Sequence, residues 1–361
     1  MLLKIEQKIL LEKAIKFHNH GNFEKAIKLY SKLIKKDKKN LQLLFLIGTA
    51  NIQLGKNIIG IEFLKKFLDI NPNNSPALIN IGNAFKNLKK YYESITYYNK
   101  AIKLDPRSSD AYSNRGTAEL NLNSFEEALL SFDNAIKINP KHFFAYNNKG
   151  IALLKLNRFK ESIFNFDKAI QINPNYIEAY NSRGSAYKNI KIYDKALSDY
   201  ERVFELNPNY DFILGKIVHS KMFLCDWKNF DAIIEKINYG LTKRLKVIDP
   251  FSYLGIVDNP THAKLASEIF VESNFPNNQN VQLLLNNKNK KIKIAYFSAD
   301  FHDHPVLHLM MDVFKNHNKE KFDIHAFSMG PDKNDKWRNE VKNYINQFRD
   351  ISKVSDLEVI N

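Results

Sequence analysis

A period of 34 residues dominates this sequence and restricts what it can fold into. Glycine recurs at that spacing five times, at Gly48, Gly82, Gly116, Gly150 and Gly184. Proline follows the same period, at Pro72, Pro106, Pro140, Pro174 and Pro208. A small residue stands twelve positions after each glycine, at Gly60, Ser94, Ala128, Ser162 and Ala196. Units of this length bury their apolar faces only by stacking on neighbours, so the period predicts an elongated array of repeats.

Each unit is predicted to be a helical hairpin. Between Ser75 and Pro106, apolar residues recur at helical spacing in two runs that separate near Lys89 and Lys90. The small positions mark where the two helices cross closely, and proline ends the second helix because it lacks an N–H donor. Aromatic residues are expected to fill the adjoining space, at Phe85, Tyr98, Phe132, Phe166 and Tyr200. Ala14 and Ala26 occupy the same positions one period earlier, so six units are expected.

This pattern resembles the tetratricopeptide repeat, and the resemblance covers residues 1–210. It implies a right-handed superhelix with a concave face lined by the first helix of each unit. The predicted fold class is therefore mainly α, a tetratricopeptide superhelix followed by an incomplete α/β lobe. Three regions are expected: six repeats in 1–210, a helical cap and linker in 211–290, and the α/β part in 291–361.

A row of asparagines is the candidate peptide-binding site of the repeats. Two residues before the glycine position the chain has Asn80, Asn114 and Asn148, followed by Ser182, whereas Leu46 breaks the row at its start. Asparagine is a poor helix former, but its amide has one acceptor and two donors. Such a row can therefore bind the backbone of an extended peptide. The alternative is that asparagine is simply abundant in this sequence.

The character of the sequence changes to α/β at Lys291. An apolar run over 292–301 predicts a strand, residues 306–318 a helix, 322–330 a second strand, and 335–347 another helix. A strand, a helix and a second strand at this spacing are typical of the beginning of a parallel, Rossmann-like sheet. In such a sheet the loop after the first strand lies at the ligand-binding edge. Before this point, a further helix is predicted over about 262–272.

The phrases CDWKNFD, DPFSYLGIVDNP and KIAYFSADFHDHPVLHLM, together with the repeats, resemble bacterial relatives of protein O-linked N-acetylglucosamine transferase. The resemblance implies repeats that bind proteins or extended peptides and a two-lobed GT-B region. That region transfers N-acetylglucosamine from UDP-N-acetylglucosamine to Ser or Thr hydroxyls with inversion. It assigns the catalytic position to His304, of a His-Pro pair, and less strongly to His308. It implies no cofactor besides the donor substrate.

A metal site is the alternative interpretation of this loop. His302, His304 and His308 stand close to Asp303 in sequence, and residues four apart share a helix face. No distant acidic or cysteine partner accompanies them, so no metal is predicted.

Charge and composition argue against other classes of partner. The net charge of +15 comes mainly from lysine, since only eight of the 54 basic residues are arginine, and the lysines are spread along the chain. This pattern favours a solvated surface over a nucleic-acid site. The longest apolar stretch is far shorter than the ~20 residues of a membrane span. The single cysteine, Cys225, fits a reducing compartment, so a cytoplasmic location is predicted.

Length raises a second interpretation of function. A two-lobed glycosyltransferase needs lobes of about 150 residues each, whereas 70 residues follow position 291. Ser355 and Glu358 form a capping box for a helix with three residues left to grow into. The chain is thus expected to be a fragment without transferase activity of its own. The alternative is a non-catalytic scaffold whose repeats bind peptides.

Overall fold

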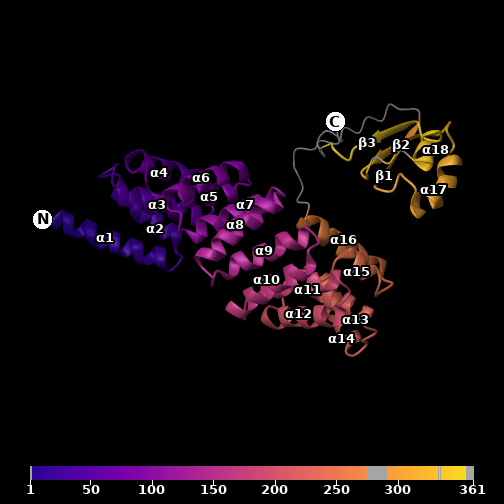
Figure 1. Cartoon of the computed structure of the whole chain (residues 1–361), viewed down its shortest axis with the longest axis horizontal. Helices are drawn as coiled ribbons and strands as arrows, with labels where there is room; N and C mark the ends of the chain where they lie inside the picture. The colour runs from indigo at the N-terminus through magenta and orange to yellow at the C-terminus, as the bar shows by residue number, and fades with distance from the viewer. Residues whose placement is uncertain (1, 275–290, 332, 334, 355–361) are drawn as a thin grey trace. The chain divides into compact units, whose positions relative to one another are not determined.

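The computed structural model describes residues 2–274, 291–331, 333 and 335–354. The chain divides into two compact units, Met1–Asn277 and Asn278–Asn361 (Figure 1). The first unit is helical, and the second contains a small sheet with helices. These features confirm the predicted fold class, a mainly α repeat fold followed by an α/β part.

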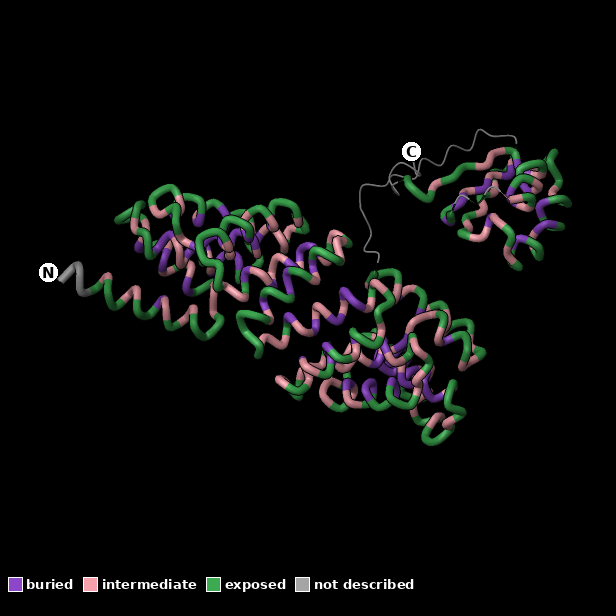
Figure 2. Tube along the Cα trace, in the orientation of Figure 1, coloured by how far each residue is buried: buried purple, intermediate pink, exposed green. Residues whose placement is uncertain are grey.

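Six pairs of helices run through residues 2–206 (Figure 1). The first helices of the pairs are α1 (Leu2–Asn19), α3 (Leu41–Gln53), α5 (Ser75–Asn87), α7 (Ser109–Asn121), α9 (Phe143–Lys155) and α11 (Ile177–Asn189). The second helices are α2 (Phe23–Ile34), α4 (Asn57–Ile70), α6 (Tyr91–Leu104), α8 (Phe125–Ile138), α10 (Phe159–Ile172) and α12 (Tyr193–Leu206). Buried residues alternate with exposed ones along these helices, as Figure 2 shows, because each helix packs one side against its neighbours.

The two helices of a pair cross at the glycine. A Cβ atom added to Gly150 would lie 2.6 Å from Cε1 of Phe166, and one added to Gly116 would lie 2.7 Å from Cε1 of Phe132. Both aromatic rings are fully buried. The small residues twelve positions later, Ser94 and Ala128 among them, are also fully buried. The predicted close crossing is therefore confirmed, and it explains why this position tolerates no side chain.

A left-handed residue closes the first helix of each pair and carries the same period. In the third pair, Lys89 has φ 59°, its N–H donates to Lys86 O, and the N–H of Lys90 donates to Phe85 O. This is the hydrogen-bond pattern of a Schellman motif. The left-handed position recurs along residues 2–206 at Gly21, Gly55, Lys89, Asn123, Asn157 and Lys191.

Each proline of the period stands two residues after the end of a second helix. α10 ends at Ile172, and Asn173 before Pro174 is extended, with φ −130° and ψ 94°. Steric contact with the proline ring keeps the preceding residue out of the helical region. The predicted helix end is therefore confirmed.

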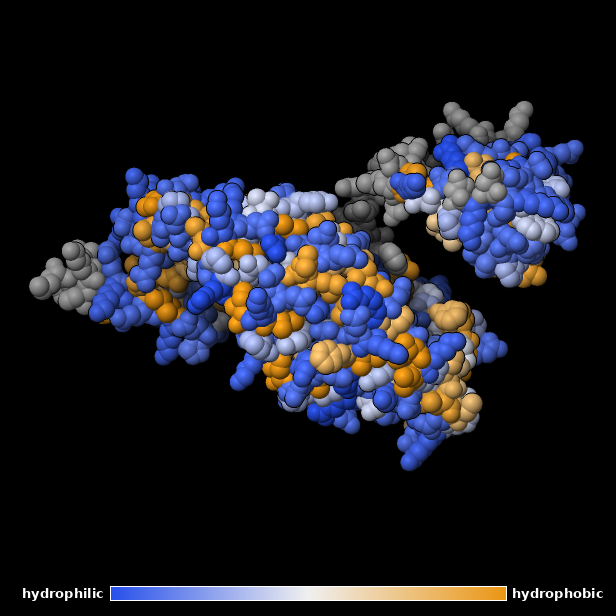
Figure 3. All heavy atoms as spheres, viewed as in Figure 1, coloured by the Kyte–Doolittle hydropathy of each residue, from blue (hydrophilic) through white to orange (hydrophobic). Residues whose placement is uncertain are grey.

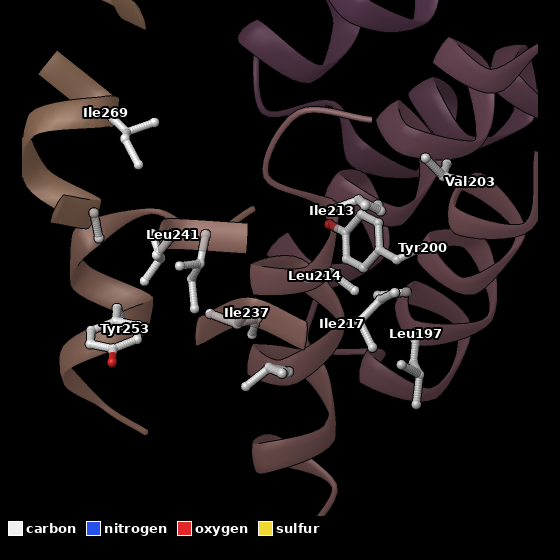
Figure 4. Close-up of a cluster of buried hydrophobic side chains, with 14 residues drawn as sticks. Leu197, Tyr200, Val203, Ile213, Leu214, Ile217, Ile237, Leu241, Tyr253 and Ile269 are labelled. Carbon is white, nitrogen blue, oxygen red and sulfur yellow. The ribbon is translucent and has the colours of Figure 1, made fainter. Parts of the chain in front are cut away.

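Four helices follow the repeats and close the first unit. They are α13 (Ile213–Phe223), α14 (Phe230–Thr242), α15 (Pro250–Leu254) and α16 (Pro260–Asn274). Figure 4 shows Ile217 of α13 lying between Leu197 of α12 and Ile237 of α14. One continuous buried cluster thus joins the last repeat to these helices. The helix predicted over 262–272 lies inside α16.

The described part of the second unit forms a three-stranded parallel sheet in the order β1 (Ile292–Ser298), β2 (Phe322–Ser328) and β3 (Gln347–Asp350). α17 (Pro305–Lys315) connects β1 to β2, and α18 (Lys336–Lys342) connects β2 to β3. The two predicted strands and the helix between them are confirmed. Ile324 and Ala326 of β2 are fully buried, and they form the core with Leu307 and Val341.

The predicted helix over 335–347 is wrong at its end. α18 stops at Lys342, and Gln347 begins β3, a strand that the sequence pattern did not indicate. The side chain and the backbone of Asn346 both bind the backbone of Ile324, which draws this segment against β2. The capping box at Ser355 and Glu358 lies outside the described residues.

Among the helices of the described ranges, none is both long and apolar enough to cross a bilayer. Hydrophilic residues cover much of the visible surface of each unit (Figure 3).

The glycine crossing makes a testable prediction. An alanine normally stabilises a helix interior by ~1 kcal/mol relative to glycine, but overpacking a tight contact costs ~1–3 kcal/mol. We expect Gly150→Ala to lower the free energy of unfolding, measured in urea, because its methyl group meets the Phe166 ring. Adding Phe166→Leu should recover part of that loss. Gly255→Ala is the control, since no atom lies closer than 3.6 Å to its added Cβ; a gain in stability at Gly150 would contradict the tight crossing.

Candidate functional site

The asparagine row connects successive first helices to one another. The amide nitrogen of Asn80 on α5 donates to Thr49 Oγ1 on α3 at 3.2 Å. Two repeats later, the amide nitrogen of Asn148 on α9 donates to Thr117 Oγ1 on α7, also at 3.2 Å. Both threonines directly follow the glycine position. The row therefore follows the stack of first helices, and its amides lie where adjacent repeats meet.

Asn114 has a different partner, and the sequence explains why. The position that holds Thr49 and Thr117 in the two adjacent repeats is Asn83 here, and its Oδ1 accepts a hydrogen bond from Tyr98 Oη at 2.7 Å. Asn114 Oδ1 instead accepts from Lys86 Nζ at 3.0 Å. Burial lowers the pKa of Lys86. Sequence reasoning found the three asparagines but missed Lys86, whose only sequence signal is a lysine at the end of a first helix.

These bonds leave the asparagine row with further hydrogen-bonding capacity. A primary amide has two donors and one carbonyl acceptor with two lone pairs, whereas each contact between neighbouring repeats uses one of these. All three side chains are partly accessible. The amides are thus held in place by neighbouring repeats and keep donor and acceptor groups for further hydrogen bonds.

In the second unit, the predicted histidine lies at the carboxyl edge of the sheet. His304 precedes α17 as its N-cap, and its Nδ1 accepts a hydrogen bond from Val306 N at 3.3 Å. Accepting at Nδ1 places the proton of a neutral ring on Nε2. The same Nδ1 lies 3.7 Å from Asp300 Oδ2, and the side chain is 38% exposed. A shift of the proton to Nδ1, toward Asp300, would free Nε2 to act as a base.

His308 lies one turn further along α17 and has other partners. Its Nε2 lies 2.8 Å from Asp303 Oδ1, and its ring meets Trp337 edge-on, with the ring centres 4.2 Å apart. Asp303 N in turn donates to Asp335 Oδ2 at 3.0 Å. His308 therefore fixes the loop after β1 against the start of α18.

The structure does not bring the histidines together around a metal. Within the part of the chain that it describes, no group of three or more His, Cys, Asp or Glu side chains could hold an ion. His304 lies near Asp300, and His308 pairs with Asp303, so each histidine interacts with a different carboxylate.

A buried arginine holds the ends of the strands together. Nη1 of Arg338 donates to Phe301 O in the loop after β1 at 3.0 Å and to Ser328 Oγ at the end of β2 at 2.9 Å. Its Nη2 donates to Asp350 Oδ2 at the end of β3 at 2.7 Å. The arginine is only 2% exposed. Sequence reasoning missed this residue because nothing in the pattern of α18 distinguishes it from a surface arginine.

Two further features fix the loop that carries His304. A Cβ on Gly330 would lie 1.9 Å from Ala299 O, so only glycine fits between the two loops. Asp335 caps α18 at Arg338 N and also binds Asp303 N. Although burial of Asp335 opposes its ionisation, these backbone hydrogen bonds lower its pKa.

A cavity of about 200 Å³ opens between β1 and α17. Its walls are largely apolar, with Met310 and Phe314 from the helix and Tyr296 from the strand, and Asp300 also lines it. Asp300, whose carboxylate lies near His304, is therefore also one of the residues around a space that could hold a small group.

Comparison with known proteins identifies the parts of the chain. Residues 259–358 match glycosyl transferase family 41. Tetratricopeptide repeats match residues 41–74, 75–108, 109–142, 143–176 and 177–210. The glycosyltransferase match begins within the segment that the sequence assigned to the linker, so it includes all of α16.

One curated relative is a probable UDP-N-acetylglucosamine–peptide N-acetylglucosaminyltransferase, SEC, of Arabidopsis thaliana. The two are 21% identical over 155 residues, which cover 38% of this chain and 16% of the relative's length. Among solved structures, the MamA protein is 25% identical over 47% of this chain and 92% of its own, with a TM-score of 0.42. YrrB, described as a tetratricopeptide protein with an unusual peptide-binding site, is 19% identical over 54% of this chain and 97% of its own, with a TM-score of 0.43.

The role of Arg338 can be tested by unfolding. Arg338→Leu removes the donors that join the strand ends and leaves two acceptors of buried residues, Phe301 O and Ser328 Oγ, without this partner. We expect a loss of about 2–4 kcal/mol in the free energy of unfolding of the second unit. Fluorescence of Trp337 in a Trp227→Phe background reports on this unit alone. Arg349→Leu, at an exposed position on β3, is the control, and equal losses for the two variants would exclude a special role of Arg338.

Proposed function

Because the chain joins tetratricopeptide repeats to a region that matches glycosyl transferase family 41, we propose that it is part of a protein O-N-acetylglucosaminyltransferase. The donor is UDP-N-acetylglucosamine, and the acceptors are Ser or Thr hydroxyls of proteins that the repeats recruit. The joint presence of the two regions in one chain carries this proposal. A cytoplasmic location, predicted from the single cysteine, belongs to the same proposal.

The repeats supply the acceptor. Asn80, Asn114 and Asn148 bind the backbone of an extended polypeptide along the concave face, so recognition depends little on side chains. Backbone recognition suits an enzyme with varied acceptors, because every peptide presents the same N–H and C=O groups. The hydrogen bonds between repeats hold the amides in place before the peptide arrives, which reduces the entropy lost on binding.

His304 supports the transfer step. The acceptor hydroxyl attacks the anomeric carbon, the bond from that carbon to the diphosphate oxygen breaks with its electron pair on UDP, and the hydroxyl proton must leave. An imidazole is suited to take that proton near neutral pH. For this role, the Nδ1 of His304 gives up the hydrogen bond from Val306 and directs a proton toward Asp300, so that Nε2 is free. His308 positions the loop through Asp303.

A peptide-binding scaffold without catalysis is the second candidate. It is favoured by one observation: the contacts that hold the asparagine row lie entirely within the first unit. Peptide binding without any transfer by the product of the complete gene would support this candidate against the enzyme.

The asparagine row predicts a binding defect. Replacing Asn80, Asn114 and Asn148 together with Ala removes backbone contacts worth ~1 kcal/mol each, so the affinity should fall about a hundredfold. Fluorescence anisotropy with labelled 12-residue peptides of Ser, Thr, Ala and Gly measures it. The control replaces three exposed asparagines, Asn134, Asn175 and Asn209, with Ala. Equal affinities for the two triple variants would show that the row only reflects the abundance of asparagine in this sequence.

The catalytic proposal is tested by transfer of labelled sugar. The product of the complete gene, incubated with UDP-N-acetylglucosamine and an acceptor peptide, should label hydroxyl side chains. His304→Ala should lower kcat by about a hundredfold, the usual contribution of a positioned base, while the Kd for the peptide stays unchanged. His20→Ala, in the loop after α1, serves as the control. Undiminished turnover in His304→Ala would exclude the histidine as the base, and no transfer by the unaltered protein would overturn the enzyme proposal.

A further inference from the structure

The positions of the asparagine row continue beyond Ser182 into the helices that follow the repeats. One period of 34 residues after Ser182 stands Lys216, on α13. Its Nζ donates to Asn181 Oδ1 on α11, and it lies 5.5 Å from the centre of the Tyr200 ring on α12. Like the asparagines before it, Lys216 contacts the first helix of the preceding repeat. A cation thus takes the place of an amide at this end of the row.

Two other basic side chains accompany Lys216. Three periods after the hydrogen-bonded pair Lys86 and Asn114, the same two positions hold Lys188 and Lys216. A lysine and an amide are thereby replaced by two like charges. His219 lies one turn along α13, and its buried Nδ1 has no hydrogen-bond partner within the described residues. We call Lys188, Lys216 and His219 the cationic end of the row.

The positive charge at this place is incompletely balanced. Asp249 is the acidic group whose charge favours the protonated forms of Lys216 and His219. Both of its oxygens are already used by Ser252, whose N–H lies 2.9 Å from Oδ1 and whose Oγ lies 2.6 Å from Oδ2, at the start of α15. Two lysine ammonium groups are thus accompanied by one carboxylate, whose oxygens already bind Ser252. This place can therefore accept one more negative charge.

The pKa values of the same groups agree with this charge balance. Burial, and then the charge of Lys188, lower the pKa of Lys216 to about 8, while Asp249 opposes the shift. Burial also lowers the pKa of His219, so this ring is neutral at pH 7 and above. Tyr200 is neutral as well, because burial raises its pKa to about 12. The pKa of Lys216 therefore lies between 7 and 9, so its charge changes within that pH range.

We infer, on the basis of the proposed peptide binding, that the cationic end binds a carboxylate of the peptide that lies along the asparagine row. The ammonium groups of Lys188 and Lys216 supply charge-assisted hydrogen bonds, and His219 supplies a further polar contact. The carboxylate comes either from an Asp or Glu side chain or from the C-terminus of the peptide. Backbone binding by the amides gives affinity without sequence preference, and this site adds a preference for an acidic group at one position.

The test compares matched labelled peptides on the full chain by fluorescence anisotropy at low salt. One set of 12-residue Ser/Thr/Ala/Gly peptides, amidated at the C-terminus, carries a single Glu at successive positions, and its partner set carries Gln there. A third peptide has no Glu and a free C-terminus. The best Glu peptide, or the peptide with the free C-terminus, should bind about tenfold more tightly than its uncharged partner. This preference should decline between pH 7 and 9 as Lys216 loses its proton.

The variant Lys216→Gln keeps an N–H donor for Asn181 and removes the charge. We expect it to reduce the preference for the charged peptide to about twofold, leave binding of the Gln peptide unchanged, and unfold at the same temperature as the unaltered chain. Lys137→Gln, at an exposed position on α8, is the matched control.

The outcomes separate this inference from the peptide-binding proposal itself. Equal binding of charged and uncharged peptides to the unaltered chain would overturn the carboxylate site and leave the asparagine row intact. A preference for the charged peptide that persists in both Lys216→Gln and Lys188→Gln would also overturn it, because another part of the chain would then bind the carboxylate. Failure of every peptide to bind would overturn both.

Discussion

The close crossing of two helices at a glycine is the constraint on which the repeat region depends. At Gly116 and Gly150 the space for a side chain is filled by the ring of Phe132 or Phe166 from the second helix of the same repeat. This contact fixes the separation of the helices in each pair. The contact recurs every 34 residues. The remaining positions of the repeat therefore also take the same place in each pair of helices. The left-handed closing residue and the proline after the second helix recur with the same period.

The asparagine row is a consequence of that regularity. In three successive repeats, the residue two positions before the glycine contacts the neighbouring first helix, so these side chains form a line. The partners along the line vary with the local sequence, since Thr49 and Thr117 accept from an amide whereas Lys86 donates to one. Packing thus fixes where the polar groups lie, and single substitutions decide their chemistry. Lys216 illustrates this, because it keeps the position and changes the charge.

The second unit is organised by polar contacts at the edge of its sheet. Arg338 binds the loop after β1, the end of β2 and the end of β3, so one guanidinium group joins three segments. Burying this charge is tolerated because five N–H donors in a planar fork can be matched by several acceptors at once. Asp335 and Gly330 then hold the loop that carries His304. The geometry of the candidate catalytic histidine therefore depends on residues that are distant from it in the sequence.

The sequence by itself determined the period, the hairpins, the glycine crossings, the first two strands and the identity of Asn80, Asn114, Asn148 and His304 as candidates. These features are local or strictly repeated, so helical spacing, small residues and proline are enough to indicate them. Only the tertiary structure decided that β3 replaces the end of a predicted helix, because the pairing of Asn346 with Ile324 is a long-range contact. Only it decided that Arg338 is buried, and that Lys188, Lys216 and His219 belong to one cluster. Burial and the meeting of charges depend on which helices pack together, and a linear pattern carries that information only where the repeat continues unbroken.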